Sequence, residues 1–181
     1  MQVYFIDNDD FFHRKNTVVD DDGTEFEDND ERCIFFVRGV IETIRKLRWV
    51  PDVVHIHGWI AALAPLYIKR AFTDDPCFRD TKVVYSVYDN AFKQPFRPSF
   101  KEKLLIDGVS EADLVDLQGE GDFEALNKLA IRYSDGVIQA SEGIDPHFVE
   151  HIEYLGKPFL AYQNSDCYID SYNDFYDQIC G

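Results

Sequence analysis

Residues 51–67 read Pro-Asp-Val-Val-His-Ile-His-Gly-Trp-Ile-Ala-Ala-Leu-Ala-Pro-Leu-Tyr, and this is the most informative stretch of the chain. Residues 52–57 form a short apolar run rich in β-branched side chains, which predicts a buried strand. Gly58 marks a sharp exit from that strand, and the apolar residues from Trp59 to about Ala71 predict a helix. The stretch is therefore one βα unit.

Strands and helices continue to alternate on both sides of this unit. Further strands are predicted at 3–6, 82–87, 136–140 and 158–162, and a long loop at 89–98. One helix is predicted with Asn29 or Asp30 as its cap and Leu47 or Arg48 as its last apolar position, and others at 100–106, 110–117, 123–133, 146–154 and 168–179. Such alternation produces βαβ crossovers. The sequence therefore predicts an α/β fold, a Rossmann-like parallel sheet with helices on both faces, in a single domain spanning 1–181.

The charge of the chain limits its partners. Asp and Glu number 34 against 18 Lys and Arg, which gives a net charge of −16. A chain of this charge repels phosphate groups, so nucleic acid and anionic membranes are excluded as partners. Because 45% of the residues are apolar, the chain has enough hydrophobic side chains for a globular core.

Eleven of the acids lie between residues 7 and 31, which we interpret as a solvated acidic loop with a turn at 20–23. Aligning that turn with an EF-hand loop places Val18 and Asn29 at ligand positions 1 and 12, so the calcium pattern fails. Weak binding of divalent ions and a basic partner remain as alternatives for the loop.

The cysteines and the N-terminus indicate the compartment. The four cysteines form no C-x-x-C pair, so we interpret them as reduced thiols. No apolar run is long enough for a signal peptide or a membrane span, which makes the cytoplasm the expected location. We expect no cofactor and no metal.

A binding site is expected where the strands end, because ligands of open α/β sheets bind beyond the carboxyl ends of the strands. This rule brings residues 7–10, 57–59, 88–90 and 140–142 to one edge of the sheet. His57 precedes a glycine that allows close approach of a ligand to the backbone, so it is the preferred functional residue.

Several other kinds of site are less favoured by the sequence. Alternation places His55 and His57 on one strand face, where a third ligand would complete a metal site, although hydrogen bonding to neighbouring groups is the more common role. Trp59 is either a sugar-stacking platform or a core aromatic residue. Ser141 and His147 lie outside any G-x-S-x-G elbow, and no glycine-rich phosphate loop is present.

With these residues identified, the chain resembles the glycogen and starch synthases of glycosyltransferase family 5. Residues 51–67 are similar to the family segment P-D-V-V-H-x-H-D-W-x-x-A-L-A-P-x-Y over seventeen positions. Residues 3–7 resemble the strand before the family's aromatic loop, 82–89 its K-x-V-x-T-V-H-N strand, and 128–141 its K-x-G-x-x-x-A-D-x-V-x-x-V-S segment. The resemblance covers about residues 1–155.

The resemblance implies a GT-B fold of two Rossmann-like domains, which transfers glucose from ADP-glucose or UDP-glucose to an α-1,4-glucan with retention of configuration. This chain would be an incomplete N-terminal domain. His57, Tyr88 and Asp89 occupy the family's catalytic positions, and His57, Gly58, Trp59 and Tyr88 its substrate-binding positions. Gly58 replaces the family's aspartate, whereas Tyr88 and Asp89 replace its histidine and asparagine.

Two functions follow from the resemblance. The first is a glycosyltransferase fragment that is inactive alone, because the family's lysine- and glycine-rich loop and the cations of its second domain are not in this sequence. The alternative is a non-catalytic module that binds a glucan or a partner protein, with Trp59, Tyr88, Phe92 and Phe96 as stacking aromatics. An incomplete sheet also predicts a homodimer, or association with complementary segments.

Overall fold

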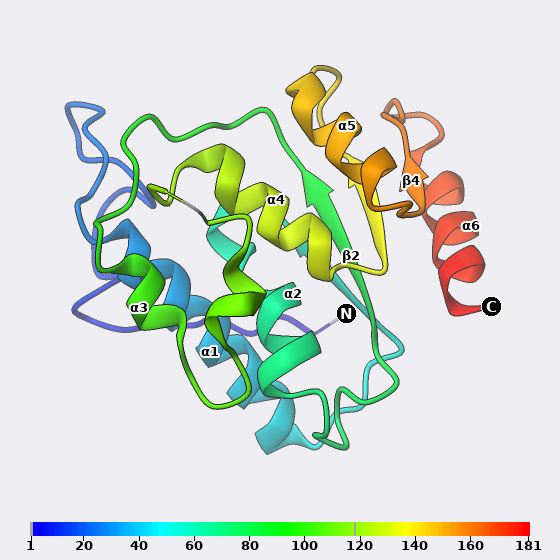
Figure 1. The fold of residues 1–181 in the computed structure, drawn as a ribbon, viewed down its shortest axis with the longest axis horizontal. Helices are drawn as coiled ribbons and strands as arrows, with labels where there is room; N and C mark the ends of the chain where they lie inside the picture. The colour runs from blue at the N-terminus through cyan, green and yellow to red at the C-terminus, as the bar shows by residue number, and fades with distance from the viewer. Residues whose placement is uncertain (1, 118) are drawn as a thin grey trace.

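A computed structural model describes residues 2–117 and 119–181 and contains one parallel sheet (Figure 1). The strand order is β1-β2-β3-β4, with bounds β1 Val53–His57, β2 Lys82–Val87, β3 Gly136–Gln139 and β4 Phe159–Leu160. His57 is in register with Ser86, and Val87 with Gln139, so three strands end at one edge. The predicted parallel α/β sheet is confirmed.

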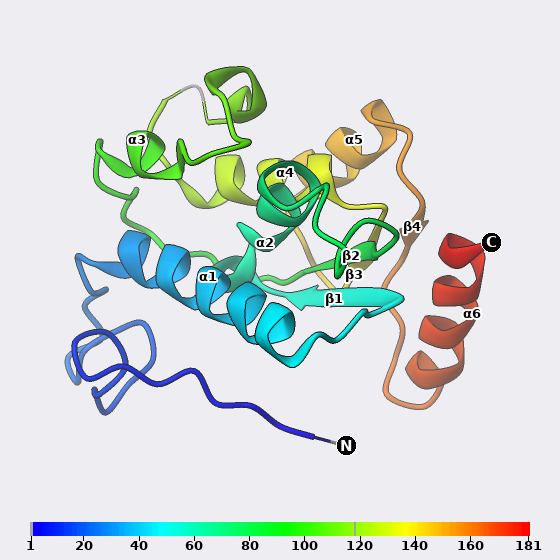
Figure 2. The ribbon, with the colours of Figure 1, turned by 90° about the horizontal axis from the view of Figure 1, so that it is seen from below.

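Helices cover both faces of the sheet. Their bounds are α1 Asn29–Leu47, η1 Trp59–Ala61, α2 Ala64–Leu66, η2 Tyr67–Ala71, α3 Phe100–Leu104, η3 Glu111–Leu114, α4 Phe123–Tyr133, α5 Pro146–Tyr154 and α6 Tyr168–Cys180. Figure 2 shows α2, α4 and α5 on one side of the sheet and α6 on the other. Each face of the sheet carries its own hydrophobic core. Successive side chains of β2 point to opposite faces, so Val83 and Tyr85 enter the larger core, whereas Val84 packs in the smaller core against Phe175 of α6.

The apolar stripe of α1 accounts for its position. Val37, Ile41 and Ile44 recur at helical spacing and are buried in the larger core. The helix ends at Leu47, and Arg48 after it adopts a left-handed conformation with a φ of 51°. The predicted helix and its end are confirmed, but the residue at its N-cap is Asp28 rather than Asn29 or Asp30.

The predicted strand at residues 3–6 is wrong, and so is the position at a strand end that it implied for residues 7–10. Residues 3–6 form no strand, and Val3 and Phe5 are 60% and 89% exposed. A β-branched run becomes a strand only when another strand pairs with it, and Ile6 instead packs against Gly39 of α1. Residues 7–10 consequently do not follow a strand end.

The predicted helices at 59–71 and 110–117 are also corrected. The first is a series of short 3-10, α and π turns, since Pro65 cannot donate to a preceding turn and lies in the first turn of α2. The second contracts to the 3-10 turn Glu111–Leu114, where Ser110 and Asp113 form a capping box.

The acidic loop packs onto α1 more closely than a solvated loop would. The Arg32 side chain is buried, lies over the rings of Phe12 and Phe26, and donates to the Phe11 carbonyl over 2.8 Å. Arg14 donates to both carboxylate oxygens of Asp28. Cations and aromatic rings within the acidic stretch thus give it a fixed position.

Candidate functional site

Three segments meet at the carboxyl edge of the sheet: residues 57–59, 88–90 and 140–142, which we call the rim. Register brings the ends of β1, β2 and β3 together at this edge. The Asp89 amide donates to the Ser141 hydroxyl over 3.0 Å, and the Gly58 amide donates to the Ser86 carbonyl over 3.2 Å. These bonds fix the three segments relative to one another.

His57 and Tyr88 form the centre of the rim. The His57 Nδ1 atom and the Tyr88 hydroxyl are hydrogen-bonded at 2.8 Å. Desolvation by the surrounding protein lowers the pKa of His57 below its ordinary 6.5, although the side chain retains an exposed surface. His57 is therefore mainly neutral at pH 7, and it can donate or accept a hydrogen bond there.

His55 lies directly beneath His57 on the same face of β1, as the alternation predicts. The two rings have centroids 4.0 Å apart. The His55 Nε2 atom bonds to the Ser86 hydroxyl at 2.7 Å and its Nδ1 atom to the Tyr176 hydroxyl at 2.6 Å. Burial and the neighbouring His57 lower the pKa of His55 to about 3. The two imidazoles thus belong to a neutral hydrogen-bonded network.

Gly58 has a backbone conformation that other residues rarely adopt, with φ 70° and ψ 175°. A Cβ atom there would lie 3.7 Å from the Asn90 side-chain nitrogen and 3.8 Å from the Tyr88 ring. Space would admit a side chain, so it is the backbone that requires glycine. Gly58 is itself buried, so this conformation serves the turn from β1 into η1 and does not present backbone at the surface.

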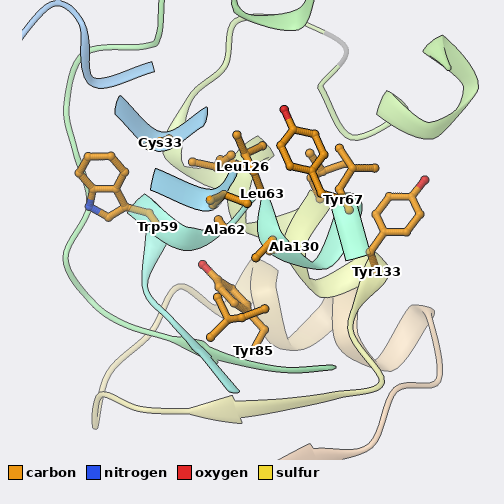
Figure 3. Close-up of a cluster of buried hydrophobic side chains, with 14 of the residues drawn as sticks. Cys33, Trp59, Ala62, Leu63, Tyr67, Tyr85, Leu126, Ala130 and Tyr133 are labelled. Carbon is orange, nitrogen blue, oxygen red and sulfur yellow. The ribbon is translucent and has the colours of Figure 1, made fainter. Parts of the chain in front are cut away.

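Trp59 belongs to the core. Its side chain is 5% exposed, and its ring lies 4.9 Å from the ring of Phe92 and 6.1 Å from that of Phe96. Figure 3 places it at one end of the buried cluster that contains Leu63 and Tyr85. Burial removes Trp59, Phe92 and Phe96 from any sugar-stacking surface, which corrects that part of the prediction. Tyr88 is the half-buried aromatic that remains at the rim.

The rim has acidic and neutral groups without a balancing cation. Its three segments contain no Lys or Arg, whereas Asp89 and Glu142 are exposed carboxylates. Carboxylate, amide, phenol and neutral imidazole groups can all hydrogen-bond to hydroxyl groups. The chemistry of the rim therefore suits neutral polyhydroxy compounds better than phosphates.

Sequence reasoning missed two contributions to this region. The Ser141 hydroxyl holds the loop after β2 by accepting from the Asp89 amide, a contact that no sequence motif indicates. Tyr172 and Tyr176 reach His55 from α6, with ring centroids 5.8 and 5.7 Å from the imidazole. The spacing of Tyr168, Tyr172 and Tyr176 by four residues indicated one aromatic helix face, without indicating what that face covers.

Over residues 2–117 and 119–181, no helix combines the length and the apolar character needed to cross a membrane. Within the same part of the chain, no group of three or more His, Cys, Asp or Glu side chains is arranged to hold a metal ion.

Comparisons with known proteins agree with the resemblance noted in the sequence. A profile of the family described as starch synthase catalytic domain matches residues 1–152. A glycogen synthase of Chlorobium limicola is 39% identical over 115 residues, which cover 62% of this chain and 23% of that protein. A glycogen synthase of Geotalea uraniireducens is 33% identical over 141 residues, covering 77% of this chain and 28% of that protein.

Among solved structures, the catalytic domain of starch synthase IV from Arabidopsis thaliana, bound to ADP and acarbose, is similar with a TM-score of 0.58. The match is 16% identical in sequence and covers 77% of this chain and 30% of that one, so it supports the fold alone. The chain spans about a quarter of the length of the curated relatives it matches.

Proposed function

The chain belongs to the starch synthase catalytic-domain family, and from this premise we propose that residues 1–181 form part of the N-terminal domain of a glycogen or starch synthase-type glycosyltransferase. The substrates we propose are a nucleotide sugar, ADP-glucose or UDP-glucose, and an α-glucan. The proposed place of action is glycogen biosynthesis in the cytoplasm. The names of the relatives and the matched segment support this proposal.

We further propose that this polypeptide does not transfer glucose by itself. The observation that carries this proposal is the absence of Lys and Arg from the rim, combined with the exposed carboxylates of Asp89 and Glu142. Departure of a nucleoside diphosphate develops negative charge, which transferases stabilise with cations or helix N-termini. Two carboxylates beside a neutral His57 would instead repel that charge.

A transfer assay tests the proposal. Purified protein is incubated with ADP-glucose or UDP-glucose, radiolabelled in the glucose, and with glycogen as acceptor, while a full-length glycogen synthase serves as the positive control. We expect no incorporation above the blank. Turnover above about 1 per second that falls on His57→Ala would contradict the proposal, because that rate is typical of working enzymes.

A second candidate function is a non-catalytic module that binds α-glucan. Half-buried Tyr88, hydrogen-bonded to a neutral His57, favours this candidate, because phenol and imidazole groups pair with sugar hydroxyls without needing a cation. Titration with maltoheptaose tests it. Binding that is weakened in Tyr88→Ala and retained in the matched control Tyr154→Ala, at an 82% exposed tyrosine of α5, would support the module. No binding by the wild type would exclude it.

A further inference from the structure

Helix α6 lies against a sheet face that adjoins the rim, and it is attached to that face by few contacts. Its residues follow the family-matched stretch, which ends at 152. Phe175 is its one buried residue, and most of the connecting residues 161–167 are exposed. The red helix at the edge of Figure 2 stands apart from the helices on the opposite face.

The attachment has an apolar part and a polar part. Phe175 and Ile179 pack over Gly136, where a Cβ atom would lie 2.2 Å from the end of the Ile179 side chain. The polar part is the 2.6 Å hydrogen bond between the Tyr176 hydroxyl and His55 Nδ1. His55 is a titratable group that lies half-buried between α6 and the sheet, so its charge bears directly on the docking of the helix.

Among residues 2–117 and 119–181, no carboxylate lies against His55 to stabilise an imidazolium. The groups that face it are His57 on β1, Ser86 on β2, and Tyr172 and Tyr176 on α6. Tyr88 is reached only through His57. The acids of α6, which are Asp170, Asp174 and Asp177, are exposed. A proton on His55 would therefore meet a second imidazole and three hydroxyl groups in a site with little water.

We propose that α6 is a pH-released latch, which docks on the sheet through His55 while both histidines are neutral and leaves the sheet when they are protonated. Release uncovers the apolar side chains of Val53, Val84 and Ile138 and opens one flank of the rim at His57. The device thereby couples acidity to access to the candidate site, and it does not depend on which substrate that site takes.

The sign and size of the effect follow from linkage. In the docked state the pKa of His55 is lowered from 6.5 to about 3, so docking is at full strength above pH 6.5 and weakens as the pH falls below it. Between pH 7.5 and 5.5, a group with these two pKa values reduces the docking equilibrium by about tenfold. The lowered pKa of His57 acts in the same direction.

Hydrogen exchange of the backbone amides measures this equilibrium. Protection factors of α6 amides, corrected for the intrinsic effect of pH, are compared at pH 7.5 and 5.5. The amides of α4 in the same sample report global unfolding and should be better protected than those of α6 at both pH values, which shows that α6 is released on its own. We expect α6 to lose about tenfold in protection between the two pH values. Equal α6 protection at pH 7.5 and 5.5, or α6 amides as well protected as those of α4, would overturn the latch.

Variants assign the effect to His55. His55→Gln should remove most of the pH dependence and leave only the part that His57 contributes, whereas the matched control His147→Gln, at an exposed histidine of α5, should keep all of it. Tyr176→Phe removes the hydroxyl but retains the ring. It should lower α6 protection at pH 7.5 and preserve the ratio of α6 protection between the two pH values, since His55 stays half-buried beside His57. A pH response of full wild-type size in His55→Gln, or unchanged α6 protection in Tyr176→Phe, would overturn the proposal.

Discussion

Trp49 and Trp59, the two tryptophans of the chain, lie in opposite environments. Trp59 is 5% exposed and packs against Phe92 and Phe96, whereas Trp49 is 56% exposed after the end of α1. A ring enclosed by other rings contributes to the stability of the core, and an exposed ring contributes little to it. The two tryptophans therefore allow the stability contribution of a buried indole to be compared with that of an exposed one.

Replacement of each tryptophan by alanine should separate the two environments. We expect Trp59→Ala to lower the free energy of unfolding by about 3 to 5 kcal/mol, because it leaves a cavity in the core. Trp49→Ala should change it by about 0.5 kcal/mol. Urea unfolding followed by circular dichroism measures both values. A loss in Trp59→Ala no larger than that in Trp49→Ala would show that the indole does not support the core.

At the scale of elements, a buried carboxylate joins α1 to the segment that leads into α3. The Asp30 side chain is fully buried and is paired with Arg97 and Lys103, which are 42% and 30% exposed. Lys103 also bonds to Glu31 at 2.7 Å. The acidic loop contributes a second connection, because the Glu25 carboxylate accepts from the amides of Lys93 and Gln94.

The effect of removing Arg97 and Lys103 on stability should depend on whether the buried Asp30 carboxylate keeps its charge. The double variant Arg97→Met with Lys103→Met leaves a buried carboxylate without a cation, which should cost about 3 to 5 kcal/mol of unfolding free energy. Adding Asp30→Asn should recover most of that loss, since the uncompensated charge is then gone. Lys15→Met, at an exposed ion pair with Asp21, should leave stability nearly unchanged. A triple variant as unstable as the double one would contradict this explanation.

At the scale of the whole molecule, exposed apolar surface and net charge have opposite effects on self-association. Tyr4 lines a hollow with Leu47 and Trp49, and Val3 and Phe5 are exposed beside it. In the described part of the chain, β1 has a strand on only one side. Free strand edges and apolar patches promote association, whereas a net charge of −16 opposes it.

We expect the chain to associate at high micromolar concentration, and more strongly in 0.5 M salt, because at roughly that ionic strength the charges are screened within a few ångströms. Light scattering at low and high salt measures this. Phe5→Ser combined with Trp49→Ser should reduce the association by removing two exposed rings. A wild-type chain that is monomeric at both salt concentrations would refute the prediction.

The sequence by itself determined the βα order, the parallel sheet and the family. Alternation in residues 82–87 and helical spacing in α1 encode which side of each element is apolar, and this information is local. For the same reason, the shared face of His55 and His57 could be predicted from two residues of one strand. The motif in residues 51–67 identified the family, because its side chains and their spacing are both specific.

The tertiary structure alone decided what covers each apolar side. Trp59 is buried because Phe92 and Phe96 arrive from a loop more than thirty residues later, and residues 3–6 are not a strand because no strand meets them. Likewise, Tyr176 reaches His55 across 121 residues of sequence. Periodicity states that a face must be covered, but the partner is chosen by long-range packing, and packing energies are summed over the whole fold.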